Sequence, residues 1–146
     1  MAGDLIRKTC LSLDAAKAIA AGAEMEAARN GWAVSIAIVD EAGRLLYFQR
    51  MDDATNASVE VSVAKALHAA NFRRPSKFQE DLLAGGNLRV LAIPGMLPLE
   101  GGLQVLYEGQ TIGAIGVSGV QAPQDGEIAT AGLAAFEQWL GGPEEG

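Results

Sequence analysis

A glycine-rich segment constrains the fold more than any other part of this chain. Residues 109–119 read Gly-Gln-Thr-Ile-Gly-Ala-Ile-Gly-Val-Ser-Gly, a turn followed by a strand pattern that contains Gly113, Gly116 and Gly119. Glycine weakens a strand unless something must approach its backbone closely. The segment therefore predicts a strand on which a helix, a second subunit or a flat ligand packs directly.

Length and composition limit the class of protein. The chain has 146 residues, of which 49% are hydrophobic and 20% charged, which indicates one soluble globular domain over residues 1–146. The net charge of −7 disfavours nucleic-acid binding, which needs a basic surface. No apolar run approaches membrane-spanning length and the first residues lack a signal-peptide pattern, so we expect a cytoplasmic protein without a membrane partner. The small charged fraction predicts a homo-oligomer.

Capping and turn signals predict the order of helices and strands. Ser12 can cap a first helix, and Gly31 can stop it. We expect helices at residues 12–30, 57–72, 77–83 and 124–140, and strands at 32–40, 44–50, 88–93, 102–107 and 111–120. Because tight turns join consecutive strands, this order predicts an α+β domain with an antiparallel sheet covered by helices.

The predicted helix at residues 57–72 is apolar on two sides. One stripe contains Val59, Val63, Ala66 and Ala70, and we expect it to pack on the sheet. The opposite stripe contains Ala57, Val61, Ala64, His68 and Phe72. In a domain of this size, such a helix is expected to lie between its own sheet and a subunit or a ligand.

His68 is the only histidine, and its place in the second stripe allows three interpretations. As a metal ligand, its neutral imidazole could bind a haem iron, with Arg73, Arg74 and Lys77 pairing the propionates. As a general base it could act in catalysis, with Lys65 or Arg73 holding a substrate carboxylate. As a structural residue it would be hydrogen-bonded at a subunit interface.

Other candidates are weaker. Phe72 would complete an apolar surround for a cofactor, and Met96 could line the pocket, ligate iron or fill its Pro-Gly loop. Asp52 and Asp53 form an acid/base pair or cap a turn. Cys10 is the only cysteine, which excludes an internal disulfide, and no second histidine or cysteine sits at zinc-ligand spacing.

Several motifs spread along the chain carry a family resemblance. They are the hairpin at residues 35–46, the segment 50–53, Lys65-Ala66 with Ala69, the segment 99–102, the strand 112–119 and Gln124-Asp125. On these motifs the chain resembles the GlcG/HbpS-like family over nearly its whole length. The resemblance implies a profilin-like fold with a five-stranded antiparallel sheet flanked by helices, and assembly into tetramers or octamers. It also implies either haem binding or degradation, or an accessory role in catabolism of small molecules.

The sequence departs from the family pattern at two places. The usual Lys-Ala-x-Thr-Ala reads Lys65-Ala66-Leu67-His68-Ala69, and the common Pro-Gly-Gly loop reads Pro94-Gly95-Met96. Histidine in place of threonine either strengthens an iron ligand or marks a subgroup with another ligand or a reaction that needs a base. We therefore predict an oligomeric haem-binding accessory protein with His68 as iron ligand. The alternative is a non-haem enzyme or binder of a small carboxylated molecule, with His68 as general base.

Overall fold

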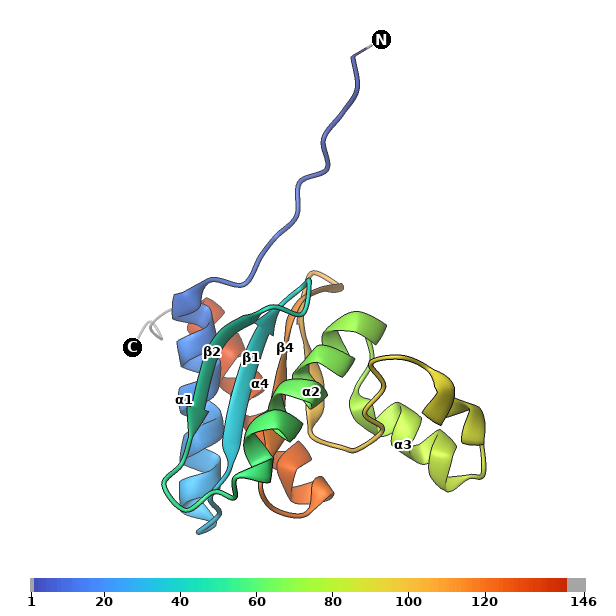
Figure 1. The fold of residues 1–146 in the computed structure, drawn as a ribbon. Helices are drawn as coiled ribbons and strands as arrows, with labels where there is room; N and C mark the ends of the chain where they lie inside the picture. Colours follow the sequence, from blue (N-terminus) through green and yellow to red (C-terminus); the bar gives the residue numbers. More distant parts are fainter. Residues whose placement is uncertain (1, 142–146) are drawn as a thin grey trace.

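Helices cover both faces of a single antiparallel sheet. The computed structural model describes residues 2–141, and its four strands lie in the order β2-β1-β4-β3 (Figure 1). The strands are β1 (Ser35–Asp40), β2 (Leu45–Arg50), β3 (Gly102–Tyr107) and β4 (Gln110–Ser118). The helices are α1 (Leu13–Arg29), α2 (Ala57–Phe72), α3 (Ser76–Ala84) and α4 (Ala122–Gly141), with a 3₁₀ helix η1 (Leu88–Ala92). Helices α1 and α4 cover one face, α2 covers the other, and the α3–η1 segment stands to one side (Figure 1).

The two faces of the sheet differ in the size of their side chains, because successive strand residues point to opposite faces. Toward α1 and α4 the central strands present large residues, namely Ile36, Ile38, Ile115 and Val117. Toward α2 they present Ala37, Val39 and Ala114, which form one buried cluster with three alanines of that helix, Ala66, Ala69 and Ala70. The alanines on both partners let the backbone of α2 come close to that of the sheet.

Gly116 of β4 is where this approach is closest. A Cβ at Gly116 would collide with the carbonyl oxygen of Ser62 and the backbone nitrogen of Ala66, both in α2. On β3, a Cβ at Gly102 would collide with the carbonyl oxygen of Lys65. The prediction that something packs directly on the glycine-rich strand is thus confirmed at Gly116, where the packing element is α2, whereas Gly113 lies against Val39 and Leu11.

The predicted fifth strand is wrong. Residues 88–93 were expected to be extended, but residues 88–92 form η1 and the sheet has four strands. Only Val90 of η1 is buried, whereas Leu88 and Leu91 are 70% and 63% exposed. A short apolar run does not distinguish strand from helix, and this one is confined between Gly85-Gly86 and Pro94-Gly95.

The predicted faces of α2 need correction as well. Its buried residues are Ser58, Ser62, Lys65, Ala66, His68, Ala69 and Ala70, whereas Val59 and Val63 are only half-buried. The close approach at Gly116 selects small residues for the sheet side, which the hydrophobic pattern alone did not reveal. Among residues 2–141, no helix is both long and apolar enough to cross a membrane.

Candidate functional site

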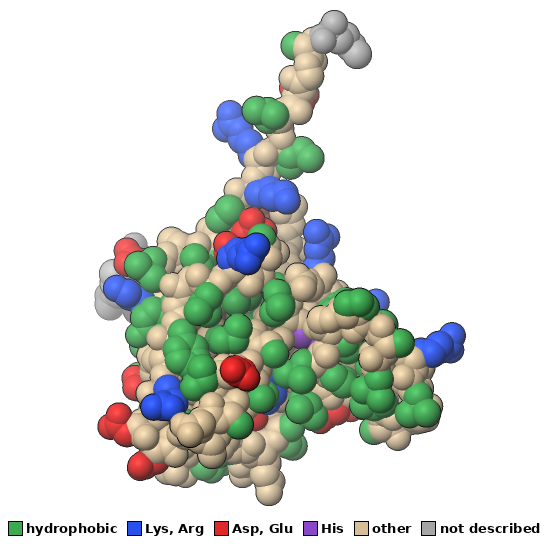
Figure 2. Space-filling model, viewed as in Figure 1, with side chains coloured by type: hydrophobic (Ala, Val, Ile, Leu, Met, Phe, Trp, Pro, Cys, Tyr) green, Lys and Arg blue, Asp and Glu red, His purple; other side chains and the backbone are tan. Residues whose placement is uncertain are grey.

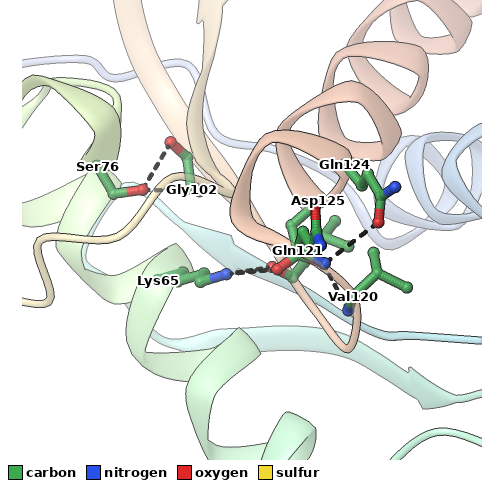
Figure 3. A network of polar contacts seen from close by, with 8 residues as sticks. Lys65, Ser76, Gly102, Val120, Gln121, Gln124 and Asp125 are labelled. Atoms are coloured by element: carbon green, nitrogen blue, oxygen red, sulfur yellow. Dashed lines mark hydrogen bonds and ion pairs between the residues drawn. The ribbon is translucent and has the colours of Figure 1, made fainter. Parts of the chain in front are cut away.

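Lys65 and Asp125 form a buried ion pair between α2 and α4. Lys65 Nζ donates to Asp125 Oδ2 at 2.8 Å (Figure 3) and to the carbonyl oxygen of Val117 at 3.0 Å. Both side chains are 2% exposed. The other carboxylate oxygen of Asp125 accepts from the Val120 backbone N–H at 3.2 Å. The pair therefore joins α2, the end of β4 and the start of α4.

The glycine pair at the start of β3, Gly101 and Gly102, closes over this ion pair. Gly101 has a φ of +130°, and a Cβ there would lie 2.8 Å from Lys65 Nζ. The Gly102 N–H donates to Ser76 Oγ at 2.9 Å, which ties the start of α3 to the same place (Figure 3). Three of the motifs that carry the family resemblance, around residues 65, 101 and 125, thus meet here.

The charges of this pair indicate a structural role. Burial raises the pKa of the Asp125 carboxyl, and the hydrogen bond and charge of Lys65 oppose that shift. Removing either partner would leave an uncompensated buried charge, which is strongly destabilising. Lys65 is a catalytic candidate from the sequence, but its pairing with Asp125 was not predicted. Its catalytic role stays a prediction.

His68 is held at both ring nitrogens. The Leu97 backbone N–H donates to His68 Nδ1 at 2.9 Å, and His68 Nε2 lies 2.9 Å from Gln79 Oε1. Because the Nδ1 atom accepts and an amide oxygen can only accept, the hydrogen must reside on Nε2. His68 is therefore neutral, with a defined tautomer, and links α2 to α3 and to the loop at residues 94–98.

The surroundings of His68 keep the imidazole neutral. The side chain is fully buried, and this burial lowers the pKa of His68, while the Gln79 hydrogen bond acts in the opposite direction. The Phe72 ring lies 5.1 Å from the imidazole, centroid to centroid. Phe72 thus lies beside His68, and half-buried Met96 precedes the residue whose N–H holds the ring; their roles in binding a cofactor stay predictions. Gln79 and Leu97 were not predicted as partners of His68.

The three predicted propionate partners differ in availability. Lys77 pairs with Asp81 at 2.9 Å, and the Arg74 guanidinium lies 4.2 Å above the ring of Phe78. Arg73 is exposed and makes no ion pair or side-chain hydrogen bond within residues 2–141. It also caps α2 with a left-handed backbone, φ 52° and ψ 46°, which costs free energy in a residue other than glycine.

The remaining candidates do not assemble into a site. Asp52 and Asp53 are exposed in the turn after β2, and Cys10 is an exposed free thiol. Across the described part of the chain, no group of three His, Cys, Asp or Glu side chains could hold a metal ion. Among residues 2–141, cavities of about 290, 390 and 560 Å³ lie elsewhere, and neither His68 nor Lys65 lines any of these three. Arg73 lines the largest of the three.

Comparison with known proteins identifies the class to which this fold and these motifs belong. Residues 11–134 match the family model described as haem degrading protein HbpS-like. Protein GlcG of Escherichia coli K12 is 42% identical over 111 residues, which is 76% of this chain and 83% of GlcG. The chain therefore belongs to the HbpS-like family.

Solved structures agree with this assignment. A crystal structure of HbpS has a TM-score of 0.83 at 35% identity, with 92% of this chain and 95% of HbpS covered. A crystal structure of a PduOC–haem complex has a TM-score of 0.79 at 27% identity, covering 87% of this chain and 95% of that one. The family and its haem-containing neighbour support a haem-related function.

Proposed function

We propose that this protein binds haem as a homo-oligomeric accessory protein and that His68 ligates the iron. The observation that carries the proposal is the buried, neutral imidazole of the only histidine in a chain of this family. Neutral imidazole is the form that ligates haem iron. Because burial lowers the pKa of His68, protons compete little for its nitrogens at neutral pH.

Iron ligation has a defined consequence for the loop at residues 94–98. If Nδ1 binds the iron, the Leu97 N–H loses its acceptor. If Nε2 binds the iron, the ring proton must move to Nδ1, which then faces the Leu97 N–H donor to donor. In both cases the bond between Leu97 and His68 breaks. Haem binding therefore requires that the loop carrying Met96 and Leu97 move away from α2.

The cationic residues near the end of α2 would interact with the propionate carboxylates. Arg73 is available for this without giving up another contact, whereas Lys77 would leave Asp81 and Arg74 would leave Phe78. Phe72, beside the imidazole, supplies an apolar surface for the porphyrin. A bound haem would supply the iron centre for ligand or redox chemistry, and these residues would only hold and orient it.

A haemin titration of the apo-protein at neutral pH tests the proposal. We expect a saturable Soret shift at one haem per subunit in the wild type, lost in His68→Ala. Gln79→Ala is the matched control, since it removes the Nε2 partner and leaves the imidazole in place. We expect it to bind haem at least as tightly as the wild type. Weak, non-stoichiometric binding that is insensitive to His68→Ala would contradict the proposal and favour the non-haem alternative.

The native mass is a separate measurement. We expect light scattering to give a tetramer or an octamer, because the described surface exposes many large hydrophobic side chains for a domain of this size. Several of them lie on the α3–η1 segment: Phe78, Leu82, Leu88 and Leu91. A monomer at all concentrations would contradict the oligomeric part of the proposal and leave haem binding to be judged by the titration.

A further inference from the structure

The N-terminal residues form an arm that leaves the body of the protein. Residues 2–10, here called the arm, are exposed and run away from the sheet in an extended path (Figure 1). Leu5 and Ile6 of the arm are 96% and 87% exposed. In the space-filling view, hydrophobic side chains on the arm stand clear of the body (Figure 2). Two adjacent large aliphatic side chains are thus left in water.

The root of the arm is fixed by the body. Leu11 is 5% exposed and belongs to the core under α1 and α4. The next residue, Ser12, accepts from the Ala15 N–H at 3.1 Å and caps α1. Between Ile6 and Leu11 the sequence Arg-Lys-Thr-Cys contains no glycine, proline, asparagine or aspartate. A tight turn that would bring Leu5 and Ile6 back to their own root is therefore disfavoured.

A largely apolar cavity of about 290 Å³ lies at this root. Its lining comes from the arm root, α1, the β3–β4 hairpin and α4: Thr9, Cys10, Leu11, Ser12, Ala15, Tyr107, Ile112, Phe136, Trp139 and Leu140. Trp139 and Leu140 remain 44% and 41% exposed. This cavity, here called the root pocket, thus offers apolar surface a few residues along the chain from an apolar arm tip.

We propose that two copies of this chain exchange arms, with Leu5 and Ile6 of each seated in the root pocket of the other. The pocket lies at the base of the same arm that carries the apolar tip, so one two-fold operation satisfies both pockets at once. Charge favours the same partner. The arm contains two basic residues, Arg7 and Lys8, and one acidic residue, Asp4, whereas the whole chain has a net charge of −7. The body that receives the arm is therefore acidic. This inference rests on the oligomeric part of the proposed function and is independent of haem.

Disulfide trapping between two different chains tests the exchange. Both chains carry Cys10→Ser; one also carries Ile6→Cys and the other Leu140→Cys, and each has its own affinity tag. The chains are mixed, allowed to exchange and oxidised. A disulfide needs Cα atoms within about 7 Å, so a link between the two chains reports the tip of one arm in the pocket of the other. An arm that folds back on its own chain cannot give this product.

The matched control replaces Leu140→Cys with Met25→Cys, on a residue 73% exposed in α1 and outside the root pocket. We expect at least tenfold more inter-chain product with Leu140→Cys than with Met25→Cys. In a second measurement, Leu5→Glu with Ile6→Glu should lower the native mass by light scattering, whereas Met25→Glu should not.

Two results would overturn the arm exchange. One is a yield of inter-chain disulfide with Leu140→Cys that does not exceed the yield with Met25→Cys. The other is an unchanged native mass in the variant with Leu5→Glu and Ile6→Glu. The Soret band is recorded on the same samples. Loss of the cross-link with haem binding intact refutes the arm exchange alone, whereas an intact cross-link without haem binding refutes only the haem proposal.

Discussion

The buried pair of Lys65 and Asp125 makes a strong prediction for stability. The Asp125 carboxylate is 2% exposed, and in Lys65→Met only the Val120 N–H would remain to stabilise it. The Val117 carbonyl oxygen also loses its lysine donor. Breaking a buried ion pair by removing one partner costs about 3–5 kcal/mol. Domains of this kind have a total free energy of unfolding of roughly 5–15 kcal/mol, so the variant is expected to be marginally stable.

Urea denaturation and thermal melting measure this cost. At roughly 3 °C of Tm per kcal/mol, we expect Tm to fall by about 10–15 °C. Adding Asp125→Leu to Lys65→Met removes the stranded charge and should recover much of the loss. Lys77→Met is the matched control, since its partner Asp81 is exposed, and we expect no measurable change.

The loss of stability in Lys65→Met should depend on pH, because the variant keeps the buried Asp125 carboxyl. Burial raises the pKa of Asp125 in the folded protein above its unfolded value. A carboxyl group with a raised folded pKa contributes its full stability below its unfolded pKa, near 4. That contribution is lost as pH rises through the folded pKa. The difference in free energy of unfolding between the wild type and Lys65→Met should therefore become smaller at acidic pH. A loss of unfolding free energy below about 1 kcal/mol at pH 7 would contradict this prediction, because it would mean that water reaches the pair.

Three further predictions concern His68, Arg73 and Gly116. Burial lowers the pKa of His68 in the folded protein. The neutral imidazole therefore contributes its full stability above the unfolded pKa of about 6.5, and this contribution falls as pH decreases below that value. Between pH 7.5 and 5.5, Tm of the wild type should therefore drop more than Tm of His68→Gln. Arg73→Gly should raise the free energy of unfolding by roughly 1 kcal/mol in urea denaturation, because glycine adopts the left-handed cap without strain. The same variant should bind haem more weakly. An unchanged haem affinity would show that Arg73 is not part of the site. Gly116→Ala should cost more than about 2 kcal/mol, since its methyl group would meet the backbone of α2, whereas Gly3→Ala, in open space, should be neutral.

Local signals predicted much of the fold. Both hairpins follow from turns at Glu41-Ala42-Gly43 and Glu108-Gly109, and the close packing on β4 follows from Gly116. These features depend on a few adjacent residues or on what glycine alone permits. The strand predicted at residues 88–93 was wrong because their apolar composition suits a strand and a 3₁₀ helix equally, and only the tertiary context decides between them.

The contacts of the candidate site were not predictable in the same way. Lys65 and Asp125 are 60 positions apart, and Leu97 is 29 positions from His68. No spacing rule connects such pairs, because their contact depends on how separate helices and loops pack together around the sheet. Gln79 is 11 positions from His68, on a separate helix, and its role depends on how α3 docks. The sequence could identify His68 as the residue of interest but not the bonds that hold it.

Hydrogen–deuterium exchange of the segment at residues 94–98, with and without haem, tests whether His68 ligates the iron. If His68 ligates the iron, the Leu97 amide must lose its acceptor. We predict that haem accelerates exchange in this segment of the wild-type protein and leaves it unchanged in His68→Ala. A wild-type Soret shift with undiminished protection of the Leu97 amide would contradict the account, because His68 would still be bonded to Leu97 and the iron would be held by another residue.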